Sequence, residues 1–155
     1  MSDAEGGTPG SDAATQLALS RVAMNAAWEA TGRNGLSPNH SQCKTEVANA
    51  RTAVEYLRAV VDLPHCDPQV AQDMVYLLDN LTGCLLGHAD DDSEYLAQAL
   101  ASSDEAYARQ RAIVDRRSAQ SPRHPFFHED LDTLEAVSHS RHYVYQAAGL
   151  EKPAP

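Results

Sequence analysis

Residues 67–87 read DPQVAQDMVYLLDNLTGCLLG, and this stretch decides the fold class. Asp67 followed by Pro68 is the usual pairing of a helix N-cap with a proline at the first helical position. Apolar side chains then recur at helical spacing over more than one face: Val70, Met74, Val75, Leu77, Leu78, Leu81, Leu85 and Leu86. A helix that is apolar on several faces is buried on several faces. The pattern therefore predicts the central helix of a bundle, ending near Gly87.

Four further segments have helical periodicity, and none shows the alternation typical of a strand. Their expected ranges are about 12–31, 37–62, 90–117 and 126–148. Because the connections are short, we predict an all-α antiparallel helical bundle of about five helices. We expect residues 1–10 to be a disordered N-terminal lead, 11–150 a single helical-bundle domain and 151–155 a flexible tail. The pattern leaves open which helix neighbours which.

The chain has 155 residues, a length that suits one domain, and a formal net charge of −10. Phosphate groups would repel such a protein, so we expect neither nucleic acid nor an anionic membrane as a partner. No apolar run is long enough to span a membrane, and the first residues lack the apolar core of a signal peptide. The three cysteines form no CxxC pair, which favours free thiols and a cytoplasmic protein.

Residues 128–142 read HEDLDTLEAVSHSRH and place a row of polar side chains on one helix face. Steps of four and three residues align His128, Asp132, Glu135, His139 and His142. Imidazole nitrogens and carboxylate oxygens are the usual protein ligands of first-row transition metals. These five residues, called the polar stripe below, are therefore candidate ligands of a divalent transition metal.

The same segment has a broad apolar side, so the polar stripe is also what an amphipathic surface helix presents to water. We favour this solvated face, because short motif matches have a high false-positive rate. One helix seldom completes a metal site, and the remaining ligands would come from water, another helix or the second subunit of a homodimer. A third interpretation is titration, in which His128, His139 and His142 gain charge near neutral pH beside acidic neighbours.

Aromatic side chains with polar tips suggest a second kind of site. Such rings line pockets for flat organic ligands, and a polar amide within an apolar helix marks such a pocket if it is buried. The candidate ligand-binding residues are Trp28, Tyr56, Tyr76, Asn80, Tyr107 and Tyr143. The commoner role of these rings is at the margin of a core, with their hydroxyl groups reaching water.

Two further features have both a functional and a plain interpretation. Cys66 follows His65 at a helix start, where the dipole and a protonated imidazole favour thiolate, although such pairs often arise by chance. Arg109 and Arg116 lie two turns apart in the basic end of one helix and suit a phosphate or carboxylate. Complementarity to the negative end of the helix dipole explains the same arginines, and we favour it.

The sequence contains no dinucleotide, P-loop, zinc-protease, hydrolase or EF-hand motif. We therefore predict a small non-catalytic binding or interaction protein, without a cofactor, that takes a small organic ligand or a partner helix and forms a homodimer. The alternative is a metal-dependent helical enzyme. In that case Glu135, His139 and His142 hold the ion, and Asp132 or His128 acts as general base or orients a ligand.

Overall fold

The computed structural model describes residues 12–32, 43–120, 122 and 124–154. These residues form five helices and no strand: α1 (Ala13–Ala30), α2 (Cys43–Arg58), α3 (Gln69–Gly87), α4 (Ser93–Ser118) and α5 (Phe127–Ala147). The predicted all-α helical bundle is thereby confirmed. The prediction for residues 1–10, and the expected start of the second helix near residue 37, lie outside the described residues. The second helix ends at Arg58, short of the expected end near residue 62, because the chain turns ahead of Pro64.

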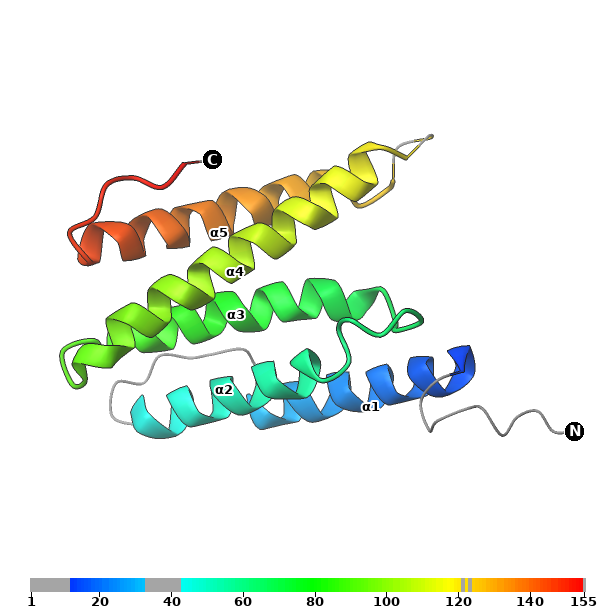
Figure 1. Ribbon diagram of the computed structural model, residues 1–155, viewed down its shortest axis with the longest axis horizontal. Coiled ribbons are helices and arrows are strands. Elements are labelled where there is room, and N and C mark those ends of the chain that lie inside the picture. The colour runs from blue at the N-terminus through cyan, green and yellow to red at the C-terminus, as the bar shows by residue number, and fades with distance from the viewer. Residues whose placement is uncertain (1–11, 33–42, 121, 123, 155) are drawn as a thin grey trace, which may run out of the picture.

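Consecutive helices lie side by side and alternate in direction, so the order along the chain is also the order in space (Figure 1). Each helix packs mainly on its neighbours in the chain, and α3 in addition contacts both α1 and α5. Because two successive reversals restore the direction, α2 and α4 run parallel to each other beside α3. This arrangement creates a site at which α2, α3 and α4 meet.

The central position predicted for residues 67–87 is confirmed by the burial of α3. Its large side chains Met74, Leu77, Leu78 and Leu85 are at most 1% exposed and face several neighbouring helices. Full burial of each such side chain stabilises the fold by about 1.5–3 kcal/mol. Helix α3 is therefore the main source of the hydrophobic core.

The buried face of α4 consists largely of small residues. Ala99, Ser102, Ser103 and Ala106 are all buried, and small side chains allow neighbouring backbones to approach. The hydroxyl oxygens of Thr82 and Ser102 lie 2.7 Å apart and share a hydrogen bond between α3 and α4. Small hydroxyl residues thus pack α4 on α3 without leaving their polar groups unpaired.

Side chains and one glycine fix several of the helix ends. Asp12 accepts a hydrogen bond from the backbone N–H of Thr15 at 2.8 Å, and Asp92 accepts one from Glu94 at 2.9 Å. Gly149 follows α5 with a φ of 70°, a conformation that glycine adopts without a Cβ penalty. Among the described residues, no helix combines the length and the apolar character needed to cross a bilayer.

Candidate functional site

A cleft of about 360 Å³ lies between the parallel helices α2 and α4, with α3 as its floor. We call it the α2–α4 cleft. Its floor is apolar and is formed by Val54, Leu78, Leu81 and Leu85, all of them buried. The side walls are lined by Arg51, Glu55 and Arg58 from α2 and by Gln98, Ala101, Ser102 and Glu105 from α4. The cleft therefore combines an apolar base with a polar, charged rim.

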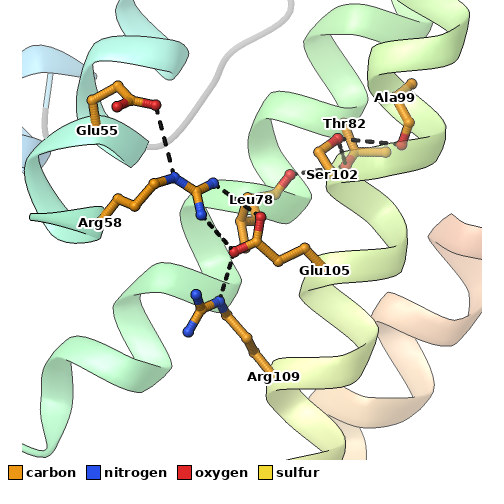
Figure 2. Close-up of polar contacts among 8 residues, drawn as sticks. All are labelled: Glu55, Arg58, Leu78, Thr82, Ala99, Ser102, Glu105 and Arg109. Carbon is orange, nitrogen blue, oxygen red and sulfur yellow. Dashed lines mark hydrogen bonds and ion pairs between the residues drawn. The ribbon is translucent and has the colours of Figure 1, made fainter. Parts of the chain in front are cut away.

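Two side-chain cross-links join the walls of the α2–α4 cleft. At one end the Nη1 and Nη2 atoms of Arg58 each donate to a carboxylate oxygen of Glu105, both at 2.9 Å (Figure 2). At the other end Arg51 donates from Nη2 to Oε1 of Gln98. Each cross-link joins residues that are 47 positions apart in the chain. The two cross-links are therefore seven residues apart on both helices, which is two turns or about 10 Å. The open space lies between them.

Charge is balanced at the Glu105 end. Arg109 donates from Nε to Glu105 at 2.8 Å, and Arg58 also lies 3.8 Å from the carboxylate of Glu55 (Figure 2). Burial disfavours the charged form of Glu105, but the hydrogen bonds from Arg58 and Arg109 outweigh it and hold the pKa of Glu105 below its ordinary value. The hydrogen bond to Glu105 raises the pKa of Arg58. Glu105 and Arg58 therefore both remain charged at neutral pH.

Arg51 differs from Arg58 in having no carboxylate partner among the described residues. Its contacts are the neutral amide of Gln98 and the ring of Tyr95, whose centroid lies 5.6 Å from the guanidinium carbon. A cation–π contact of this kind orients the guanidinium without neutralising it. Arg51 is thus the cation of the cleft that is available to an anionic group.

The six predicted ligand-binding residues do not line the α2–α4 cleft. Tyr56, Tyr76 and Tyr143 lie on three different helices and are 45%, 44% and 66% exposed. Trp28 packs against the core and donates from Nε1 to the carboxylate of Asp73 at 3.0 Å. These rings lie at the margins of the core or on the surface, and the structure does not gather them around one cavity.

The remaining two members of that set are partly buried. The ring of Tyr107 lies 4.5 Å from the guanidinium of Arg141, which donates to Asp104 at 2.8 Å and to the carbonyl of Ala154 at 3.1 Å. Tyr107 borders a smaller cavity of about 210 Å³ beside this C-terminal segment. The Nδ2 atom of Asn80 is buried and has no hydrogen-bond partner within the described part of the chain.

The polar stripe lies on α5, and most of it faces solvent. His128, Asp132, Glu135 and His139 are exposed, His142 is half-buried, and the closest approach is 3.9 Å between His139 Nε2 and Glu135 Oε1. Within the described ranges, no three side chains of His, Cys, Asp or Glu form a group that could hold a metal ion. Metal binding by the stripe, and a homodimer that would complete such a site, stay predictions.

Cys66 does not have the environment expected of a reactive thiolate. Burial is the main cause that raises the pKa of its thiol, and the nearby carboxylates of Asp67 and Asp62 raise it further. The raised pKa disfavours the reactive-thiolate interpretation and agrees with the plain one, a chance pairing of Cys66 with His65. Cys84 is buried in the core.

The cross-links of the cleft were not predicted, although the sequence contains a signal for them. Arg51 and Arg58 share a spacing of seven residues with Gln98 and Glu105, so two helices in parallel register bring both pairs together. That register depends on the order of the helices in space, which the pattern leaves open. Comparisons of the chain with models of protein families, with curated proteins and with solved structures found no match.

Proposed function

We propose that this protein is a non-catalytic binding module that takes a small organic ligand in the α2–α4 cleft. The observation that carries the proposal is the cleft itself, with an apolar floor of three leucines and a valine and a rim of a few polar groups. Ligand sites have this composition, because apolar area supplies affinity and a few polar groups fix orientation. The volume of about 360 Å³ is within the usual range of such pockets, roughly 300–1,000 Å³.

The two cross-links favour a small ligand over a partner helix. The two cross-links are only about 10 Å apart along the walls, whereas an α-helix with its side chains is itself about 10–12 Å wide and needs several turns of contact. A docked helix would also have to break the bidentate pair between Arg58 and Glu105, at the cost of two partly desolvated charges. A compact molecule fits between the cross-links without disturbing them.

Arg51 supports a ligand that combines an apolar body with an acidic group. The apolar body packs on Leu81 and Leu85, and the acid group accepts the N–H groups of Arg51 in place of the amide of Gln98. Glu105 does not repel this group strongly, since Arg58 and Arg109 neutralise it. Specific binding at Arg51 is therefore compatible with a protein whose net charge is −10.

The proposal is tested with 1-anilinonaphthalene-8-sulfonate, a fluorescent probe that has an aromatic body and one anionic group. Titration of the folded protein should show saturable binding of one probe molecule. Ala101 is exposed and lines the cleft, so Ala101→Phe should fill the space and leave the fold intact. We expect the Kd of the probe to rise by at least about tenfold, which corresponds to a loss of about 1.4 kcal/mol.

The matched control is Ala108→Phe. Ala108 is also an exposed alanine of α4, but it lies outside the cleft, and its replacement should leave the Kd unchanged. Circular dichroism and thermal melting confirm that both variants are folded, which matters because partly unfolded proteins also bind this probe. Binding that is absent, or that both variants weaken equally, would rule out the cleft as the ligand site.

A further inference from the structure

A second cavity lies at the other end of the α3–α4 interface, where the first turn of α3 meets the last turns of α4. Its volume is about 320 Å³. We call it the Arg116 pocket, and its polar lining is Gln72, Arg116, Arg117, Gln120 and His124. Ile113 is its largest apolar lining residue. The Arg116 pocket shares no lining residue with the α2–α4 cleft, so a ligand bound here is independent of the proposed function.

Arg117 is held in place at this pocket by a buried carboxylate. Its Nη1 atom donates to both oxygens of Asp130 at 2.9 Å, and the side chain of Asp130 is only 3% exposed. The N–H groups on Nε and Nη2 of Arg117 are not used by this pair. An arginine that is anchored at one edge presents its remaining donors in a fixed direction at little cost in side-chain entropy.

The anchor is itself supported by a chain of buried amides. Gln110 donates from Nε2 to the backbone carbonyl of Asp130, and Gln72 donates from Nε2 to Oε1 of Gln110, both at 2.9 Å. Gln72 and Gln110 are buried polar side chains, 8% and 0% exposed. Buried polar networks are costly unless every member is paired, and when paired they rigidify their surroundings. The network fixes the position of Arg117 relative to α3 and α5.

Further donors surround the same space. Arg116 is exposed and has no carboxylate partner within the described part of the chain. The backbone N–H of Phe126 donates to Nδ1 of His124 at 3.1 Å, which leaves Nε2–H as the donor of the neutral ring. The start of α3 also borders the cavity, but its N-terminal end is capped by Asp67, whose carboxylate accepts from the backbone N–H of Gln69 at 2.9 Å. Two guanidinium groups and an imidazole are thus the donors that border the cavity.

We propose that the Arg116 pocket binds the phosphate group of a small phosphate monoester. The donor set distinguishes phosphate from carboxylate: two arginines and a histidine offer more N–H groups than two carboxylate oxygens accept, and they match a dianion with three free oxygens. Ile113 provides an apolar surface for the organic part of the ester. Complementarity to the dipole of α4 accounts for the charges of Arg116 and Arg117, but not for the buried network that anchors Arg117.

The test is isothermal titration calorimetry of the whole protein with phenyl phosphate, a monoester with a small apolar body. Saturable binding of one molecule is expected. Arg116 is exposed and can be changed without loss of the fold, and Arg116→Gln should weaken binding by about tenfold or more, since it removes charge-assisted hydrogen bonds. Arg111→Gln is the matched control. Arg111 lies on the same helix outside the pocket, so the net charge changes equally while binding should not.

Benzoate, which carries a carboxylate in place of phosphate, tests the chemical class. Binding of benzoate as tight as that of phenyl phosphate would overturn the assignment to phosphate. The absence of saturable phenyl phosphate binding, or equal weakening by Arg116→Gln and Arg111→Gln, would overturn the site itself. Loss of probe fluorescence in Ala101→Phe does not affect this titration, so failure at the α2–α4 cleft and failure here are distinguishable.

Discussion

Arg117 and Asp130 form an ion pair, so removing either side chain alone should destabilise the fold strongly, whereas removing both together should destabilise it much less. Arg117→Met leaves the carboxylate of Asp130 buried, 3% exposed, and without its cation. Breaking a buried pair in this way costs about 3–5 kcal/mol, because the surviving charge is desolvated and unpaired. For a chain of this length that loss corresponds to a fall in Tm of roughly 10 °C. It is also a large part of a typical folding stability of about 5–15 kcal/mol.

The double variant Arg117→Met with Asp130→Leu removes both charges and supplies apolar volume. It should therefore be at least about 2 kcal/mol more stable than Arg117→Met alone, since a well-packed apolar pair often replaces a buried ion pair without net loss. Urea unfolding followed by the fluorescence of Trp28 measures both values. Arg111→Met, which breaks an exposed pair with Asp115, serves as control and should leave the stability unchanged. A double variant as unstable as the single one would refute the reasoning.

Burial and charge give three other predictions. Leu77→Ala should lower the free energy of unfolding in urea by about 2–5 kcal/mol, because Leu77 is fully buried. Leu86→Ala should lower it clearly less, because Leu86 is half-buried. Equal losses would contradict the central position of α3. Burial raises the pKa of Asp79 despite a hydrogen bond from Ser140, so the folded state binds this proton more tightly than the unfolded state. The protonated side chain therefore stabilises the fold below the ordinary pKa of about 4, and this stability is lost as the pH rises through the pKa of the folded state. Asp79→Asn should raise Tm at pH 7 and reduce the decrease of Tm with rising pH. The double variant His139→Ala with His142→Ala should shift Tm by less than about 2 °C and leave the metal content of the protein unchanged. If elemental analysis showed that the double variant loses a stoichiometric transition metal, the interpretation of the polar stripe as a solvated face would be wrong.

Helix positions were predictable because their signals are local. The helix start at Asp67 and the apolar rows of residues 67–87 depend on side chains within a few positions of one another. The end of α2 was predicted less accurately. The helical periodicity of the sequence continues to residue 62, but the chain already forms turns before Pro64 and the helix ends at Arg58. Local chemistry thus determines where helices start and end, with errors where two local signals compete.

Neither candidate site was predictable in the same way, because both depend on residues that come together only after the helices pack. The pairs of the α2–α4 cleft are 47 residues apart, and the buried network joins Gln72 to Gln110 across 38 residues. Sequence patterns assign glutamine and aspartate to the surface, so the burial of Gln110 and Asp130 could not be expected from their types. The aromatic residues are candidate ligand contacts by their chemistry alone, and that chemistry does not specify their neighbours.

The order of the helices explains why both cavities border the interface of α3 and α4. Because α4 presents small side chains to α3, the two backbones approach along the middle of the interface, where Ser102 and Ala106 are buried. Larger and longer side chains stand on either side of this contact: Arg58 and Glu105 toward α2, and Arg117 with Asp130 toward α5. They cannot pack as closely as the small residues. Arg58 and Glu105 line the α2–α4 cleft, and Arg117 lines the Arg116 pocket, so both cavities have charged rims. Replacing Ala106 with a larger residue should therefore alter both proposed binding activities at once, whereas Ala101→Phe and Arg116→Gln should each alter one.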